Sequence, residues 1–349
     1  MNLKFNKGEW SEFYTFIKIL SDGRLPLADS KMNNRNSEYL QVLAVLNNNI
    51  DYTRSENNIT FVFEDDVISI PVKKFKENSE LLLNAILNSK GRTFEVESAS
   101  HFANTLHIDS LKQSSRKKGD IKIKVHDAFT NADLVQNFSV KSYLGSKPTL
   151  LNASNGTIIK YKVLGNEVSD EEINEINTCS SHILDRLNLI SKKGLKIVYD
   201  DMNDATFKEN LQMIDTNFPE LLAELYLSSY YVKGKALNKV VPYYLAKNTS
   251  ANKKIITYNV KEFLISIALG MVPKTAWSGL DEANGGYIVV KKDGEIVCYY
   301  IYDRNDLKQY LYDQTHFDTP SSKRTNLGII ERENDGSLYF NLTVQIRFK

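Results

Sequence analysis

The chain has 349 residues, of which 42% are hydrophobic and 25% charged, and its formal net charge is +1. This is the composition of a globular protein long enough for two domains. The near-zero charge excludes a globally basic nucleic-acid-binding protein, so a DNA-binding surface must be local. No run approaches the ~18 apolar residues of a membrane span, and the N-terminus has no apolar signal-peptide core. The two cysteines, Cys179 and Cys298, are far apart in the sequence, which predicts buried free thiols. We therefore expect a cytoplasmic protein.

Residues 8–20 predict an amphipathic helix. At ~100° per residue, one side gathers Trp10, Phe13, Phe16, Ile17 and Leu20. The opposite side, Ser11, Thr15 and Lys18, should face solvent. Glu9 falls inside the apolar arc and Glu12 at its edge, and a carboxylate on a buried face needs a cation, a hydrogen-bond donor or a metal. Glu9 is therefore either a first-turn residue favoured by the helix dipole or part of a metal site.

Two further helices are predicted at 35–49 and 78–89, with a small hairpin at 60–63 and 67–72 between them, and 93–107 should be helical or mixed. Four cations then precede Asp120: Lys112, Arg116, Lys117 and Lys118. Such a cluster is usually a solvated loop. Beside a catalytic hairpin it would suit phosphates.

Residues 119–146 predict the hairpin around which the chain is organised. Strict alternation at 121–126 and 137–141 indicates half-buried strands, and the polar tract at 130–133 indicates the loop between them. Because residues two apart share a face of a strand, one face should carry Asp120, Lys122, Lys124, Ser139 and Lys141. A carboxylate and a lysine that converge at the base of one hairpin are typical of a metal-dependent nuclease.

The remaining elements are a strand at 157–163, helices at 170–190, 204–230, 259–271 and 306–314, and two hairpins with Asp293-Gly294 and Asp335-Gly336 at their turns. Pro219 marks a break in the helical stretch at 204–230. The last strand ends in Gln345 and Arg347, side chains able to form bidentate contacts with A or G. The predicted class is α+β, with a mixed central sheet flanked by helices. We expect a nuclease core at 1–165 and a helical and β-rich part at 166–349 that contributes to DNA recognition.

Several stretches carry a family resemblance: NKGEWSEFYTF, GDIKI, FSVKSYLGS, GGYIVVKKDGE, FDTPSSKR and LTVQIRF. Over most of its length the chain resembles the HpaII-type Type II restriction endonucleases, which are divergent PD-(D/E)xK nucleases. The resemblance implies Mg²⁺-dependent cleavage of double-stranded DNA at CCGG. It also implies a cognate DNA methyltransferase, and a palindromic target would favour either a homodimer or two sequential nicks by a monomer.

The resemblance places Asp120 at the first acidic position of the motif and Lys141 at its lysine. Ser139 stands where a second acid is expected, and serine is a poor ligand for a hard cation. We therefore expect Glu9 or Glu12 to supply the missing carboxylate and the Val140 carbonyl to complete the Mg²⁺ ligands. DNA contacts are expected from Lys117, Lys122, Ser142, Lys147, Asn152, Ser154, Lys323, Arg324, Gln345 and Arg347.

Two other functions compete with the endonuclease. Ser139 would also fit a DNA-binding protein whose catalytic centre has decayed, although Asp120 and Lys141 are both retained. A metal-dependent hydrolase of small phosphates is the third candidate, but the sequence has neither a phosphate-cradling Gly-rich loop nor a His-rich cluster.

Overall fold

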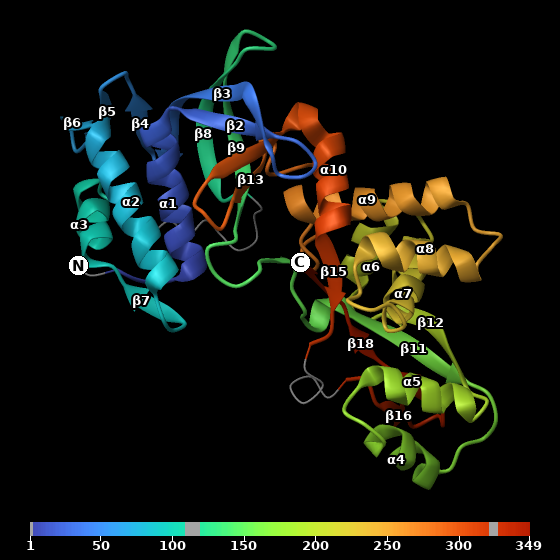
Figure 1. Cartoon of the computed structure of the whole chain (residues 1–349). Coiled ribbons are helices and arrows are strands. Elements are labelled where there is room, and N and C mark those ends of the chain that lie inside the picture. The colour runs from blue at the N-terminus through green and yellow to red at the C-terminus, as the bar shows by residue number, and fades with distance from the viewer. Residues whose placement is uncertain (1–2, 109–118, 321–326) are drawn as a thin grey trace. The chain divides into compact units, whose positions relative to one another are not determined.

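The computed structural model describes residues 3–108, 119–320 and 327–349, and the chain divides into two compact units (Figure 1). Unit 1 comprises Met1–Pro148, Ala268–Gly270 and Leu280–Tyr310, and unit 2 comprises Thr149–Ile267, Met271–Gly279 and Leu311–Lys349. The division therefore does not follow the expected boundary at 165/166, because the chain leaves unit 1 at Pro148 and later returns to it. Both helices and sheets are present, which confirms the α+β class.

A nine-stranded mixed sheet forms the centre of unit 1, in the order β2-β14-β13-β9-β8-β3-β4-β5-β6. Its strands are β2 (Arg24–Ala28), β3 (Asn34–Asn47), β4 (Ile50–Arg54), β5 (Asn58–Phe63), β6 (Asp66–Pro71), β8 (Ile121–Asp127), β9 (Ala132–Ser142), β13 (Gly286–Val290) and β14 (Ile296–Tyr300). β13 runs parallel to β9. The predicted hairpins at 60–72 and around Asp293-Gly294 are both confirmed.

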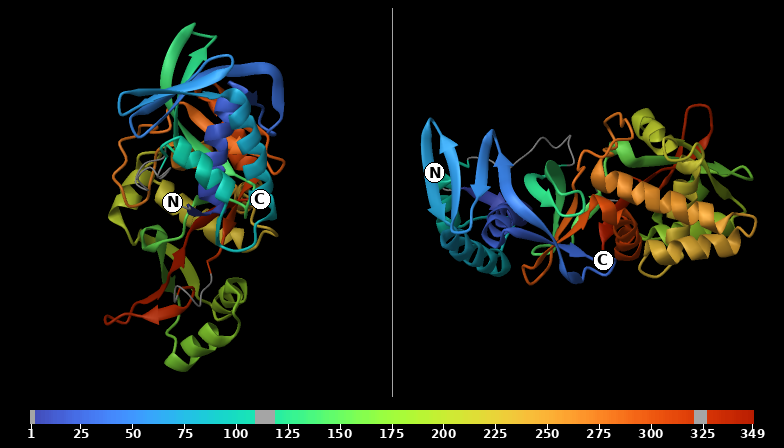
Figure 2. Two further views of the ribbon diagram at one scale, coloured as in Figure 1. Left: turned by 90° about the vertical axis from the view of Figure 1, so that its left-hand side faces the viewer. Right: turned by 90° about the horizontal axis from the view of Figure 1, so that it is seen from above.

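In the described part of unit 1, the sheet is covered by α1 (Lys7–Asp22), α2 (Val72–Asn88) and α3 (Glu97–Thr105). In Figures 1 and 2, α1 and α2 lie side by side. Their apolar side chains share one core with the strands, in which Trp10, Phe16 and Leu82 are buried beside Val45 and Ile123. The small β1 (Lys4–Asn6) and β7 (Thr93–Glu95) pair separately, so 93–107 is mixed, as expected.

The prediction that one side of α1 faces solvent is wrong. Ser11 and Thr15 are only 1% and 0% exposed. Their hydroxyls donate to the helix backbone, to the carbonyls of Lys7 (2.6 Å) and Ser11 (2.7 Å), respectively. Because these short side chains satisfy their own polar atoms, α1 is buried on nearly all sides and periodicity alone could not show it.

The predicted helix at 35–49 is also wrong, because these residues form β3. Leu40, Val42 and Ala44 are buried while Gln41 is exposed, as a strand requires. Asn48 and Asn49 both have positive φ (46° and 69°) and form the two-residue turn to β4. β3 pairs with β2, β4 and β8, and this pairing outweighs the helix propensity of its leucines.

The described residues of unit 2 form two sheets. One sheet consists of β11 (Ile158–Leu164), β12 (Lys196–Met202), β16 (Ile330–Arg332), β17 (Leu338–Phe340) and β18 (Leu342–Thr343). The other has the order β10-β19-β15, and its strands are β10 (Thr149–Leu151), β15 (Thr315–Asp318) and β19 (Gln345–Phe348). Its helices are α4 (Asp170–Thr178), α5 (Ile183–Lys192), α6 (Ala205–Gln212), α7 (Phe218–Ser229) and α8 (Leu237–Lys247). α9 (Lys253–Leu269) and α10 (Arg304–Gln314) have residues in both units.

Two expectations for unit 2 need correction. The helix predicted at 170–190 is two helices, because the chain breaks at 179–182, although Ser169 and Glu172 do form the predicted capping box. Cys298 of unit 1 is buried as expected, but Cys179 of unit 2 is exposed. Among the described residues, no helix is both long and apolar enough to cross a bilayer.

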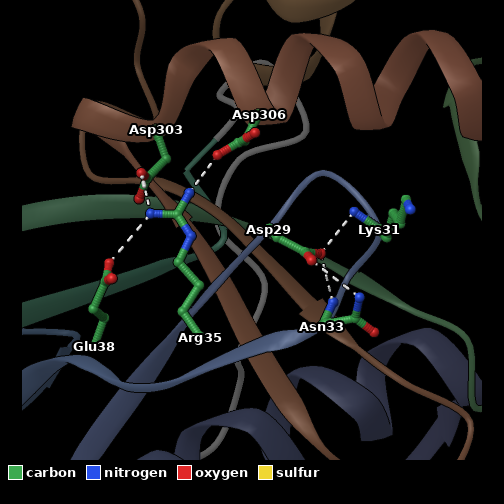
Figure 3. Close-up of polar contacts among 7 residues, drawn as sticks. All are labelled: Asp29, Lys31, Asn33, Arg35, Glu38, Asp303 and Asp306. Carbon is green, nitrogen blue, oxygen red and sulfur yellow. Dashed lines mark hydrogen bonds and ion pairs between the residues drawn. The ribbon is translucent and has the colours of Figure 1, made fainter.

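A polar cluster in unit 1 is centred on Arg35 of β3 (Figure 3). Its Nη1 lies 2.9 Å from Asp303 Oδ1 and 3.3 Å from Glu38 Oε2, and its Nη2 contacts Asp306. Burial raises the pKa of Asp303, with Asp306 and Glu38 adding to the effect, although Arg35 opposes it. The cluster joins the start of β3 to the 303–306 segment.

Candidate active site

The β8–β9 hairpin forms with the predicted register, and it holds Asp120 just before β8. Ile121 lies opposite Phe138, and the Asp120 N–H donates to the Phe138 carbonyl (2.8 Å). The carboxylate oxygen Oδ2 then accepts hydrogen bonds from the Val140 N–H (2.6 Å) and the Ser139 hydroxyl (3.1 Å). Asp120 is therefore fixed by the backbone and side chains of the partner strand.

Lys141, the residue after Val140 in β9, also lies near the Asp120 carboxylate. Its Nζ lies 3.9 Å from Asp120 Oδ2 and donates to the Val140 carbonyl (3.2 Å). The two side chains remain 24% and 27% exposed, so a solute can reach them. All of these contacts use Oδ2, and Asp120 Oδ1 forms no hydrogen bond or ion pair with the described residues.

Ser139 stands where the resemblance led us to expect a second acid, and its side chain is 1% exposed. It does not line the small cavity beside Asp120. Its one contact with the site is the hydrogen bond that it donates to Asp120. In this geometry Ser139 positions the carboxylate.

The two glutamates of α1 have different surroundings. Glu9 closes the capping box of the helix: its Oε2 accepts the Asn6 N–H (2.8 Å), while the Asn6 side chain accepts the Glu9 N–H (3.1 Å). This favours the first-turn interpretation of Glu9. Glu12, one turn later, lines a cavity together with Asp120 and Val140.

That cavity has a volume of about 20 Å³, enough for one water-sized group. Its walls are Glu12, Phe16, Leu46, Asn47, Asp120, Ile121 and Val140. Two carboxylates on the wall of one cavity suit a hard cation such as Mg²⁺, which keeps several waters or substrate oxygens among its ligands. Within the described parts of the chain, no group of three or more His, Cys, Asp or Glu residues gathers as a complete metal cage.

Asp127, at the other end of β8, has a structural role. It is fully buried, and its carboxylate accepts the Phe129 N–H (2.8 Å) and the Tyr300 hydroxyl (3.2 Å). Burial would raise the pKa of Asp127, but the hydrogen bonds from Phe129, Thr130 and Tyr300 outweigh it and lower that pKa. These contacts lie at the hairpin turn, away from Asp120 at the base.

The other residues predicted in unit 1 lie around the hairpin. Lys122 and Lys147 are exposed, whereas the Ser142 hydroxyl accepts the Leu144 N–H (3.1 Å) and stabilises a turn. Lys117 lies outside the described residues.

In unit 2, Asn152 is exposed and Ser154 caps a short 3₁₀ helix at Asn155–Thr157. Gln345 and Arg347 are half-buried on alternate positions of β19, with Arg347 Nη1 3.6 Å from Asp318 Oδ2. Lys323 and Arg324 lie outside the described residues. No contact in the structure assigns a DNA-binding role to any of these side chains.

Sequence reasoning missed Asn47, which lines the cavity beside Asp120. Leu46 pairs with Lys122, so the end of β3 lies next to the start of β8. Had the Asn48-Asn49 pair been interpreted as a hairpin turn, β3 would have been predicted as a strand and Asn47 as a neighbour of the hairpin.

Comparison with known proteins agrees with the resemblance carried by these motifs. A family model described as HpaII restriction endonuclease matches residues 6–348. The Type II restriction enzyme HpaII of Haemophilus parainfluenzae is 38% identical over 355 residues, which cover 98% of this chain and 98% of that enzyme. No solved structure matches the chain. With a match that runs from the cap of α1 through both strands of the hairpin to β19, the chain belongs to the HpaII family of Type II restriction endonucleases, which are site-specific deoxyribonucleases.

Proposed function

We propose that the chain cleaves double-stranded DNA at the palindrome CCGG in a Mg²⁺-dependent reaction, and that the β8–β9 hairpin is a PD-(D/E)xK-type centre. The observation that carries this proposal is that Asp120 and Glu12 of unit 1 line one small cavity, with Lys141 Nζ 3.9 Å from the Asp120 carboxylate. The target sequence is inferred from the resemblance to the HpaII-type enzymes.

Asp120, Glu12 and the Val140 carbonyl would hold the metal ion. A bound divalent cation polarises the phosphoryl oxygen and lowers the pKa of a coordinated water. The Oδ1 atom of Asp120 is the oxygen available for this purpose, since Oδ2 already accepts the hydrogen bonds from Ser139 and Val140. Glu12, through its place on the cavity wall, supplies the carboxylate that the Ser139 position lacks.

Lys141 would orient the attacking water and neutralise charge that develops on the phosphate. Its ammonium is held near Asp120 by the Val140 carbonyl, so the cation is already in place before substrate binds. Preorganised charge of this kind stabilises a transition state without reorganisation during the reaction. Ser139 acts as a positioning residue, because its hydroxyl fixes the rotamer of Asp120.

Recognition of DNA would use residues of both units. Lys122 and Lys147, both exposed, suit backbone phosphates, and Gln345 and Arg347 suit base edges. Further phosphate contacts would come from Lys117, Lys323 and Arg324. The short polar side chains that would contact DNA are Ser142, Asn152 and Ser154. The palindrome implies either a homodimer or sequential nicking by a monomer, and protection of the host DNA implies a cognate methyltransferase in the same cytoplasm.

One observation favours a second candidate, a DNA-binding protein with a decayed centre: Ser139 stands where the motif has an acid. Digestion of an unmethylated plasmid of known sequence, with Mg²⁺ and then with a chelator, separates the candidates. We expect discrete, Mg²⁺-dependent fragments whose ends map to CCGG. Fragments that end elsewhere would remove the proposed target, and duplex binding without cleavage in any divalent metal would favour the decayed centre.

A further inference from the structure

Unit 2 contains a cavity of about 730 Å³ that the proposed catalytic site does not use. Three segments of unit 2 form its walls: 181–184 at the start of α5, the turn from Tyr230 to Lys235, and 316–320 in and after β15. The side chains on the walls combine aromatic rings with cationic or titratable nitrogens. They include Lys235, His182, His316, Tyr230 and Phe317.

Lys235 is the main cation of this cavity, and it is held without a carboxylate partner. Its Nζ lies 3.7 Å from the centroid of the Tyr230 ring and donates a hydrogen bond to the Thr319 hydroxyl. No described carboxylate lies within ion-pair distance of it. Burial lowers the pKa of Lys235 to about 8, and Asp318 opposes this only in part. An ammonium in this situation has lost water without gaining a counter-charge, so an anion entering the cavity would be bound favourably.

Asp318, the carboxylate on the cavity wall, is engaged elsewhere. Its Oδ2 lies 3.6 Å from Arg347 Nη1, and its Oδ1 accepts the Thr319 N–H (2.9 Å). The Asp318 carboxylate is therefore shared with Arg347 of β19, and its electrostatic effect on Lys235 offsets the burial only in part. Among the described residues, the Lys235 ammonium therefore has an electrostatic partner in Asp318 but no carboxylate in ion-pair contact.

The cavity also adjoins the strand that the sequence already indicated for DNA contact. In the β15–β19 pair, His316 lies opposite Arg347 and Asp318 opposite Gln345. Because directly opposite residues of an antiparallel pair share a face, these four polar side chains form one row. A ligand in the cavity would contact one end of a surface that also presents Gln345 and Arg347.

We propose that this cavity binds the sugar-phosphate backbone of DNA and that Lys235 contacts one phosphate. The inference rests on the proposed function, since it takes duplex DNA as the substrate. A compact ammonium is a common phosphate ligand, whereas the planar fork of an arginine fits a base edge with greater geometric specificity. Lys235 therefore adds affinity that does not depend on sequence.

Binding of the full chain to short duplexes, in chelator so that no cleavage occurs, tests this assignment. Lys235→Met is compared with Lys233→Met, which removes an exposed lysine two residues away that does not line the cavity. Fluorescence anisotropy at several salt concentrations gives the Kd and its salt dependence. We expect Lys235→Met to weaken binding about tenfold and to reduce the slope of log K against log salt by about 0.9, the value for one lost phosphate contact. Lys233→Met should change neither quantity.

Two duplexes, one with CCGG and one without, distinguish the kind of contact. A phosphate contact predicts equal losses on both, whereas a loss confined to the CCGG duplex would overturn the assignment in favour of base reading. An unchanged slope in Lys235→Met would also overturn it. Because the ammonium is partly desolvated, neither Lys235→Met nor the second variant, Lys235→Gln, should lower the melting temperature. A wild-type chain that fails to bind duplex DNA would instead refute the proposed function itself.

Discussion

Unit 1 holds two clusters of carboxylates and cations that differ in how completely their charges are satisfied. At Arg35, one guanidinium contacts Asp303, Glu38 and Asp306 (Figure 3). At the hairpin, Asp120 receives all of its contacts on Oδ2, and its second oxygen forms none with the described residues. A small cavity with Glu12 on its wall lies beside Asp120. A structural cluster uses its charges within the fold, while a site for a cation and substrate retains unused ligand capacity.

The Asp29 carboxylate shows the structural pattern on a single side chain. Its Oδ1 accepts the N–H groups of Lys31 (2.8 Å) and Asn33 (2.9 Å), and its Oδ2 accepts the Asn33 side-chain amide (3.0 Å). Burial of the carboxylate opposes the effect, but these hydrogen bonds lower the pKa of Asp29. The comparison therefore predicts large losses of activity at the hairpin and losses of stability alone at the structural acids.

The largest effect is expected at the hairpin itself. Asp120→Asn and Lys141→Met should each reduce plasmid cleavage by about 10³-fold, because each removes preorganised charge from the reacting phosphate. Duplex binding should persist. Asp133→Asn is the matched control, since Asp133 is an exposed acid of β9 in the same hairpin and is paired with His126 (3.0 Å). Cleavage by Asp120→Asn at the rate of the control would remove the hairpin from the active site.

The second effect separates the two glutamates of α1. Glu12→Gln should lower the cleavage rate about 100-fold through loss of a metal-binding carboxylate. Glu9→Gln should cleave normally, because a glutamine can still accept the Asn6 N–H in the capping box. Initial rates on one plasmid preparation measure both variants. If Glu9→Gln is the inactive one, Glu12 is not the missing ligand.

The Arg35 cluster should affect stability and leave chemistry unchanged. Arg35→Met leaves the partly buried Asp303 without its cation and should lower the free energy of unfolding by about 2 kcal/mol. Urea unfolding measures the change, and Lys31→Met, at an exposed lysine, should leave it unaltered. Cleavage per folded molecule should equal that of the wild type. A specific loss of catalysis in Arg35→Met would show that the two clusters are not functionally distinct.

The smallest effect concerns pH. The folded-state pKa of Asp127 is lowered, so its hydrogen bonds stabilise the native state above the unfolded pKa and lose that contribution as pH falls through the folded value. Asp127→Asn should therefore be less stable than the wild type at pH 6, and the difference should shrink towards pH 3. Urea titrations at the two pH values test the sign. A difference that grows on acidification would mean that Asp127 is destabilising when ionised.

The sequence was sufficient for the parts of the fold in which local pattern and tertiary contacts agree. The alternation in 121–126 and 137–141 predicted the hairpin and its register, and with them the approach of Asp120 to Ser139 and Lys141. Asp293-Gly294 predicted the β13–β14 hairpin for the same reason: the turn chemistry is encoded in two adjacent residues.

The sequence was insufficient where long-range pairing decides the outcome. β3 contains leucines that favour a helix, and only its pairing with β2, β4 and β8 makes it a strand. The proximity of Glu12 to Asp120 depends on how α1 packs against the sheet, which no local pattern encodes. Lys235 was missed because an isolated lysine in a turn carries no signal until its burial is known.

The dependence of the cleavage rate on Mg²⁺ concentration tests the central claim most directly, namely that Asp120 and Glu12 share one metal site. The rates of wild type, Glu12→Gln, Asp120→Asn and the double variant form a cycle. We predict that Glu12→Gln requires at least about tenfold more Mg²⁺ for half-maximal cleavage and that the double variant is no slower than Asp120→Asn alone. An unchanged Mg²⁺ requirement in Glu12→Gln, or fully multiplicative losses in the double variant, would contradict a shared site.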